Sequence, residues 1–123
     1  MLNTPPVFAV YVCMLTLRWL KAQGGVAAIE KLNDEKAALL YAAIDESPLF
    51  TGTVNKEDRS KMNVCFVMND STQEEAFLKY TKDNGIVGIK GHRLVGGFRA
   101  SLYNALPISS VQVLVNLIKD FKQ

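Results

Sequence analysis

Residues 88–101 hold the densest group of side chains that could bind an anion. The segment contains the only histidine of the chain, His92, and two of its four arginines, Arg93 and Arg99. Guanidinium and imidazole groups suit phosphate or carboxylate, and the interspersed glycines let the backbone approach a ligand closely. On a strand, Arg93 and Arg99 would lie on one face, because six residues separate them. The same composition is also typical of an exposed basic turn, and spacing alone does not separate the two interpretations.

The N-terminal run Asn3-Thr4-Pro5-Pro6 is a second candidate anion site. Proline is common in the first turn of a helix, so an amide and a hydroxyl stand just ahead of a predicted helix. Such side chains suit an N-cap, and they equally suit a phosphate docked at a helix N-terminus. From the residues alone, capping is the favoured interpretation. Lys90 lacks the closed pocket or cationic neighbour that a Schiff-base lysine needs.

The composition gives no support to several classes of function. A net charge of +2 over 123 residues is too small to indicate a nucleic-acid or membrane-surface partner. Cys13 and Cys65 lie in apolar runs without metal-ligand spacing, which predicts buried free thiols, no metal site and a reducing, cytoplasmic compartment. The apolar run 7–17 is too short to span a bilayer and does not fit a signal peptide.

Two helices are predicted in the first part of the chain. Residues 6–23 form a helix that stops at Gly24-Gly25, and its first three turns are apolar on every face. Such a helix is buried all round, and a chain of this size has little material to surround it, so a larger body is expected. A second, amphipathic helix is predicted over residues 26–45.

The remainder is predicted to alternate strands and helices. The run 62–68 is a strand that pairs with residues 50–54, and residues 86–89 form another short strand. Two further helices are expected. A capping box of Ser71 with Glu74 opens the first, and a left-handed C-cap at residues 83–85 closes it. A capping box of Ser109 with Gln112 opens the second. The pattern predicts an α+β fold, a short sheet with helices packed on it.

These segments together resemble the phosphoserine aminotransferases of the class V aminotransferase family. The resemblance runs nearly end to end. It rests on Asn3-Thr4-Pro5-Pro6, Trp19-Leu20-Lys21 leading to Gly24-Gly25, Glu30-Lys31, Glu35-Lys36-Ala37, Asp58 to Asn63, Lys90 to Arg93, Val95-Gly96-Gly97, Arg99-Ala100-Ser101 and Tyr103-Asn104-Ala105.

The resemblance implies roles for five residues. Asn3 and Thr4 would reach across a homodimer to the phosphate of pyridoxal phosphate in the neighbouring subunit, which replaces the capping interpretation. His92 and Arg93 would hold the substrate's phosphate or distal carboxylate, and Arg99 would hold its α-carboxylate. The family's Schiff-base lysine, pyridinium-binding aspartate and ring-stacking aromatic lie upstream of the Asn-Thr-Pro-Pro motif and are expected to be absent from this chain.

The resemblance also implies a domain organisation and a function. Residues 1–23 would be an interdomain helix that bridges to a missing N-terminal, cofactor-binding domain, and residues 24–123 the small C-terminal domain of a fold-type I enzyme. The complete enzyme would transfer an amino group between glutamate and 3-phosphohydroxypyruvate in serine biosynthesis, and 4-phosphohydroxythreonine of vitamin B6 synthesis is a further substrate candidate. The rival hypothesis is a free-standing anion-binding or regulatory module, which would bury its first helix in its own core.

Overall fold

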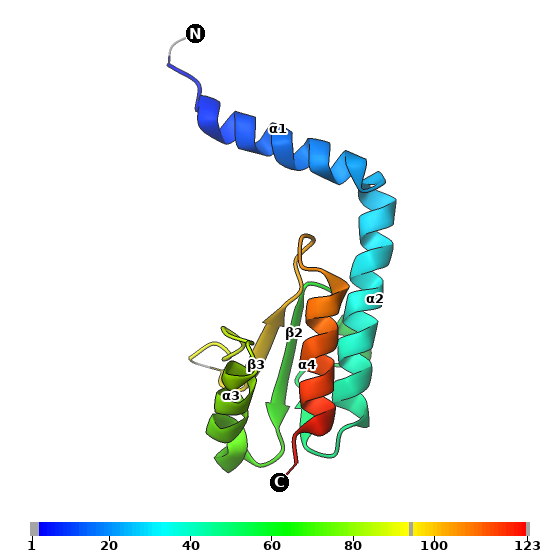
Figure 1. Ribbon diagram of the computed structural model, residues 1–123, viewed down its shortest axis with the longest axis vertical. Coiled ribbons are helices and arrows are strands. Elements are labelled where there is room, and N and C mark those ends of the chain that lie inside the picture. The colour runs from blue at the N-terminus through cyan, green and yellow to red at the C-terminus, as the bar shows by residue number, and fades with distance from the viewer. Residues whose placement is uncertain (1–2, 94, 123) are drawn as a thin grey trace. The chain divides into compact units, whose positions relative to one another are not determined.

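The computed structural model describes residues 3–93 and 95–122 (Figure 1). Leu94, inside the segment predicted to bind an anion, lies outside the described residues. In the described part, four α-helices and a three-stranded sheet confirm the predicted α+β class. The elements are α1 Val7–Ala22, α2 Gly25–Glu46, β1 Phe50–Gly52, β2 Asn63–Met68, α3 Glu74–Asp83, β3 Phe98–Ser101 and α4 Ile108–Asp120, with 3-10 turns at Lys56–Asp58 and Ser71–Gln73.

The chain forms two compact units, Met1–Leu32 and Asn33–Gln123. The boundary between them lies inside α2, so the second unit contains residues 33–46 of that helix. The assignment of residues 1–23 to an interdomain helix and of residues 24–123 to a small domain concerns a complete enzyme, and it stays a prediction.

Helix α1 has the predicted bounds to within one residue at each end. It begins at Val7, directly after the two prolines, and no side chain caps its N-terminus. It ends before Gly24 and Gly25, whose φ angles of 96° and 78° belong to the left-handed region that glycine adopts without strain.

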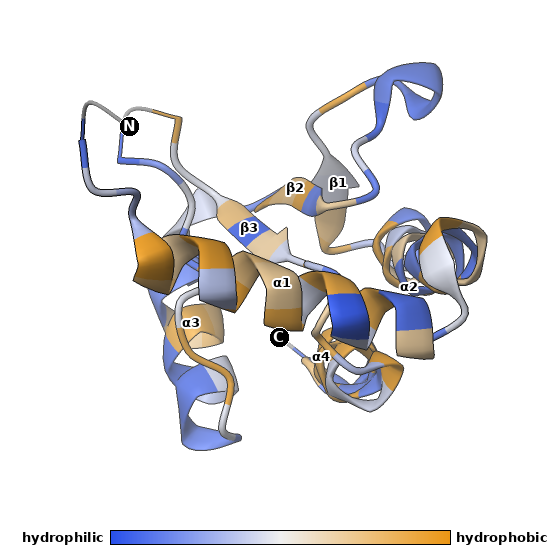
Figure 2. Cartoon of the chain, turned by 90° about the horizontal axis from the view of Figure 1, so that it is seen from above, coloured by the Kyte–Doolittle hydropathy of each residue, from blue (hydrophilic) through white to orange (hydrophobic). Residues whose placement is uncertain are grey.

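No residue of α1 is buried, and the side chain of Phe8 is 80% exposed. In Figure 2 much of α1 is orange and apolar, and its blue end is the C-terminal half that carries Arg18 and Lys21. Cys13, predicted to be a buried thiol, is therefore exposed. None of the described helices is long and apolar enough to cross a bilayer.

The second unit is built on an antiparallel sheet in the order β1-β2-β3. β1 pairs with β2 as predicted, with Phe50 opposite Met68, and β2 pairs with β3, with Phe66 opposite Phe98. Successive side chains of a strand point to opposite faces of the sheet. In Figure 2, α3, α4 and the second-unit part of α2 lie on one side of the sheet.

The covered face of the sheet is held by packed aromatic rings. Phe50, Phe66, Phe77 and Phe98 are each at most 3% exposed, and their ring centroids lie 4.8–6.3 Å apart. Several of these pairs meet edge to face, an arrangement that adds to the stabilisation from burial, about 1.5–3 kcal/mol per ring. This cluster fixes the position of β3 against α3.

The opposite face of the sheet carries no such core. We call it the outer face, and its side chains are half-buried or exposed: Thr51, Asn63, Cys65, Val67, Arg99 and Ser101. Cys65, predicted to be buried, is accordingly only half-buried.

The predicted strand over residues 86–89 does not form. Gly85 and Gly88 adopt left-handed φ angles of 84° and 78°, which interrupt the extended backbone that a ladder needs. Only an isolated bridge, Lys90 opposite Phe98, and a hydrogen bond from the Arg99 amide to the Ile89 carbonyl tie this segment to β3.

Both predicted capping boxes are also wrong, although both helices form. Asp70 caps the 3-10 turn Ser71–Gln73, which lies ahead of α3. Its carboxylate accepts hydrogen bonds from the Thr72 amide and hydroxyl at 3.0 and 2.7 Å. Pro107 stands at the N-cap of α4, and Ser109 lies inside the helix. The C-cap of α3 is as predicted, with Gly85 left-handed.

Lys36 is one of the largest fully buried side chains among the described residues. It lies on the face of α2 that packs on the connection between β3 and α4. Its ammonium donates to the backbone carbonyls of Leu102, Tyr103 and Leu106 at 3.2, 2.9 and 3.2 Å. Burial lowers the pKa of Lys36, but three acceptors use all three N–H groups of the charged form. The lysine therefore ties this connection to α2.

We expect Lys36→Met to destabilise the chain by about 2–4 kcal/mol, because it leaves one buried and two part-buried carbonyl groups without a donor. Urea unfolding followed by circular dichroism measures the change. Lys31→Met, at an exposed lysine of the same helix, is the matched control and should shift stability by less than about 0.5 kcal/mol. Equal effects of the two substitutions would contradict this role for Lys36.

Candidate functional site

The segment predicted to bind an anion forms a closed loop that leads into β3. The Gly91 amide donates to the Gly97 carbonyl at 2.8 Å and closes the base of the loop. Inside it, the amides of Val95 and Gly96 both donate to the His92 carbonyl at 2.8 Å. His92 and Arg93 thus lie in a tight loop whose ends are fixed by backbone hydrogen bonds.

Glycine is required at both ends of this loop. A Cβ at Gly91 would collide with the carbonyl of Gly96, and a Cβ at Gly97 would lie 2.7 Å from both the Phe66 carbonyl oxygen and the Val67 Cγ1. Gly97 also has a left-handed φ of 62°. The glycines therefore permit the loop to close directly on strand β2.

The two arginines of the segment take different positions. Arg93 is exposed in the loop, while Arg99 is exposed on β3, where it lies opposite Cys65 on the outer face. A spacing of six would put both arginines on one face of a strand, but Arg93 is not in a strand, so this prediction is wrong. What joins the two is the loop closure at Gly91 and Gly97.

Asn3 and Thr4 lie ahead of α1, in the first unit, and both are exposed. The N-cap of α1 is Pro6, and no side chain makes a capping hydrogen bond there. The capping interpretation of these two residues is therefore wrong. Within the described part of the chain, their amide and hydroxyl make no hydrogen bond and can donate to a ligand.

Lys90 is exposed and takes part only in the bridge to Phe98. Lys36, which sequence reasoning missed, is buried, but its ammonium is saturated by carbonyls. Neither lysine has the setting of a nucleophile. Within the described ranges, no group of three or more His, Cys, Asp or Glu side chains could hold a metal ion.

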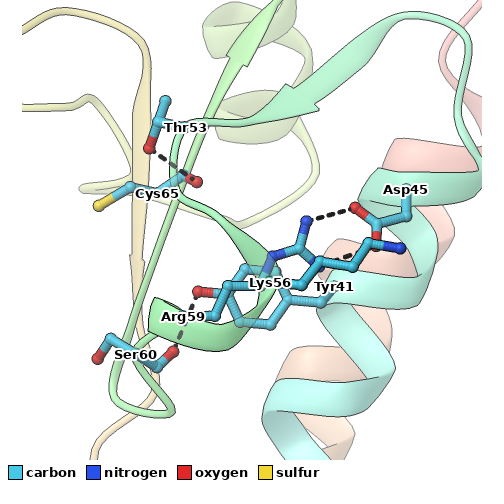
Figure 3. Close-up of polar contacts among 7 residues, drawn as sticks. All are labelled: Tyr41, Asp45, Thr53, Lys56, Arg59, Ser60 and Cys65. Carbon is cyan, nitrogen blue, oxygen red and sulfur yellow. Dashed lines mark hydrogen bonds and ion pairs between the residues drawn. The ribbon is translucent and has the colours of Figure 1, made fainter.

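Arg59 is an arginine whose two terminal nitrogens are both engaged by a carboxylate (Figure 3). Its guanidinium donates to both carboxylate oxygens of Asp45 at 2.8 and 2.7 Å, and it stacks 4.4 Å above the ring of Tyr41. Tyr41 in turn donates to the Ser60 carbonyl at 3.1 Å. A run of mixed charge such as residues 57–61 is typical of a solvated turn, yet the Arg59 side chain is only 14% exposed. This cluster fastens the turn between β1 and β2 to α2.

Comparison with known proteins identifies the class. The model of the family described as Aminotransferase class-V matches residues 1–114. The chain belongs to the class-V aminotransferases.

Within that class, the relatives of the chain are phosphoserine aminotransferases. The chain is 60% identical to the one from Porphyromonas gingivalis over 124 residues, and 62% identical to the one from Flavobacterium johnsoniae over 119 residues. These alignments cover 99% and 97% of the chain, but only 34% and 33% of the relatives. The chain thus spans about a third of the length of the curated relatives it matches.

Solved structures agree with the sequence matches. The fold matches a phosphoserine aminotransferase from Bacillus circulans with a TM-score of 0.91 and 42% identity, over 95% of this chain and 33% of the other. A pyridoxal-phosphate-bound phosphoserine aminotransferase from Trichomonas vaginalis matches with a TM-score of 0.89 and 40% identity, over 98% and 35% of the two chains. The fold is that of one part of such an enzyme.

The cluster around Arg59 generates a pH-dependent prediction. Hydrogen bonds from Arg59 hold the pKa of Asp45 below its ordinary value, so the folded state binds a proton less readily than the unfolded state. The resulting stabilisation is complete above the ordinary pKa, about 4, and is lost as the pH falls through the lowered pKa.

We expect Asp45→Asn to cost about 1–2 kcal/mol at pH 7 and to reduce the loss of stability below pH 4. Urea unfolding at pH 7 and at a series of acidic pH values measures both effects. The control is Glu57→Gln, at an exposed carboxylate two residues before Arg59. This variant should retain the wild-type pH dependence. A wild-type pH dependence in the Asp45 variant would exclude this interaction as its source.

Proposed function

We propose that this chain forms the C-terminal third of a pyridoxal-phosphate-dependent phosphoserine aminotransferase. The complete enzyme would exchange an amino group between glutamate and 3-phosphohydroxypyruvate, with 4-phosphohydroxythreonine as a further candidate. The observation that carries the proposal is 60% identity over 99% of the chain to a phosphoserine aminotransferase. A cytoplasmic location and the absence of nucleic-acid and membrane partners are parts of the same proposal.

The residues ahead of α1 fit the phosphate of pyridoxal phosphate. Asn3 and Thr4 present an amide and a hydroxyl that do not cap the helix, and such donors suit a phosphate oxygen. When bound, the cofactor supplies the electron sink for amino-group transfer, and a lysine of the remaining two thirds of the enzyme would carry it. In this proposal the two residues act on the cofactor of the neighbouring subunit in a homodimer.

The loop and β3 would hold the substrate at its two ends. Arg99, at a fixed position in the sheet, suits the α-carboxylate, because a guanidinium binds a carboxylate through two parallel hydrogen bonds. His92 and Arg93, in the loop, suit the phosphate of phosphoserine or the distal carboxylate of glutamate. Loop closure at Gly91 supports this division by separating the two positions while tying them to one strand.

The exposed helix α1 has two apolar faces that two other protein surfaces would cover in the complete enzyme. At 100° per residue, Phe8, Leu15 and Trp19 share one face of the helix. The opposite face bears a shallow apolar groove lined by Ala9, Val10, Cys13, Met14, Leu17, Arg18 and Lys21. One body packed against a helix covers one face, so we assign the two faces to the missing large domain and to the second subunit. The exposure of this helix disfavours the free-standing module, which would bury it.

Transamination should need the missing part of the enzyme. We expect the 123-residue chain, incubated with pyridoxal phosphate and reduced with borohydride, to gain no stoichiometric cofactor adduct by intact mass. It should also transfer no amino group from glutamate to 3-phosphohydroxypyruvate, because neither Lys36 nor Lys90 has the setting of a nucleophile. The complete enzyme assayed in parallel is the positive control. Turnover by the purified chain alone would show that it is not an inactive part of a larger enzyme.

The two ends of the substrate can be separated by kinetics in the complete enzyme. Arg99→Lys keeps the charge but loses the paired donors, so kcat/KM should fall for glutamate and phosphoserine alike. His92→Ala and Arg93→Ala should impair phosphoserine more than glutamate, because a dianionic phosphate depends more strongly on cationic contacts. Each lost contact is expected to cost about 1.5–3 kcal/mol.

The matched control for these variants is Lys90→Ala, which removes a neighbouring exposed charge outside the assigned site. A near-wild-type Arg99→Lys enzyme, or equal losses for the two substrates in the His92 and Arg93 variants, would show that the assignment of the two ends is wrong.

A further inference from the structure

Arg99 and Arg59 lie in the same unit of the chain but differ in what faces them. Arg59 faces Asp45, and the carboxylate occupies both terminal nitrogens of its guanidinium. Arg99 lies directly opposite Cys65 in the pairing of β2 with β3. Among the described residues, the Arg99 side chain makes no hydrogen bond or ion pair, and it is exposed.

On the outer face of the sheet, a side chain of β2 lies beside each outward position of β3 and beside Gly97, which directly precedes that strand. Asn63 accepts a hydrogen bond from the Ser101 hydroxyl at 3.2 Å, and Val67 packs against the backbone of Gly97. Between these two pairs lies the pair of Cys65 with Arg99. Directly opposite side chains in an antiparallel pair have Cβ atoms about 4.5–5.5 Å apart, so the residue at position 65 is the nearest cross-strand neighbour of Arg99.

The chemistry of that neighbour decides whether Arg99 can bind a ligand. A thiol is small and a weak acceptor, and it gives a guanidinium little reason to stay on the sheet. A carboxylate at the same place would pair with the guanidinium as Asp45 pairs with Arg59. The outer face as defined above contains no acidic side chain.

We propose that Cys65 is a positioning residue of the carboxylate site, which keeps the place opposite Arg99 small and uncharged so that the guanidinium stays available to a ligand carboxylate. The proposal rests on the proposed function, because it takes Arg99 as the group that holds the α-carboxylate of the substrate. Cys65 is half-buried and lies outside the segments that carry the family resemblance.

The first experiment tests the juxtaposition in the 123-residue chain. We expect the carboxylate introduced by Cys65→Asp to pair with Arg99, so its pKa, followed by NMR titration, should be lower than in the double variant Cys65→Asp/Arg99→Gln. Circular dichroism and urea unfolding verify that both variants are folded. Equal pKa values in the two folded variants would overturn the proposal.

The second experiment tests the consequence in the complete enzyme. Cys65→Asp should raise KM at least tenfold for both glutamate and phosphoserine, because both substrates carry an α-carboxylate, and kcat at saturation should change less than threefold. Cys65→Asn has the same shape without the charge and should stay within threefold of wild type, as should Cys65→Ser. A loss of folding would lower kcat and change Tm, which distinguishes it from this effect.

The outcomes of these experiments distinguish the proposed role of Cys65 from the proposed function of the enzyme. If Cys65→Asn raises KM as much as Cys65→Asp, charge at position 65 does not control Arg99 and the proposal is wrong. It is also wrong if KM is unchanged in Cys65→Asp. The wild-type complete enzyme tests the proposed function independently: if it does not transfer the amino group of glutamate to 3-phosphohydroxypyruvate, that function fails whatever the titration shows.

Discussion

The ammonium of Lys36 ties the connection between β3 and α4 to α2. The connection between β3 and α4 has no regular secondary structure, and its carbonyl groups turn inward toward α2. A single positive charge satisfies three of them, and Asn33 adds a hydrogen bond to Asn104 at 2.9 Å. Because β3 ends where this connection starts, the position of the strand that carries Arg99 depends on a lysine more than sixty residues earlier in the chain.

The candidate site combines this fixed strand with the loop that precedes it. Three features hold Arg99 in place: the aromatic cluster beneath β3, the pairing of β3 with β2, and the anchored connection after it. His92 and Arg93 lie instead in the loop whose base is closed by the hydrogen bond from the Gly91 amide to the Gly97 carbonyl. In the proposed site, the group assigned to the α-carboxylate thus lies on a paired strand, and the groups assigned to the distal phosphate or carboxylate lie in the loop before it.

Sequence patterns predicted the elements better than their ends. The helices, the strand at residues 62–68 and its pairing with β1 follow from hydrophobic spacing and were predicted correctly. The capping boxes failed because Asp70 caps the 3-10 turn ahead of α3, and because α4 already begins at Ile108, one residue before Ser109. The strand at residues 86–89 failed because two glycines take left-handed conformations.

For the site, residue types were enough to select His92, Arg93 and Arg99, but not to place them. The pairing of Arg99 with Cys65 requires the register of two strands more than thirty residues apart. Lys36 could not be found from its pattern, because a lysine on an amphipathic helix is expected in solvent, and its three acceptors become visible only when α2 meets residues 102–106. The exposure of α1 could not be predicted from its own pattern, because a helix that is apolar on every face is expected to be buried.

The hydrophobic core has a consequence for the order in which the protein acquires its structure. Every member of the core cluster in the described chain, together with the apolar residues packed against it, lies between Ala37 and Phe121. The second unit can therefore reach its native packing from its own residues, whereas no residue of α1 is buried. When this chain is synthesised by itself, α1 leaves the ribosome before the unit that follows it, so its exposed apolar side chains precede the folded body and are a natural binding site for chaperones.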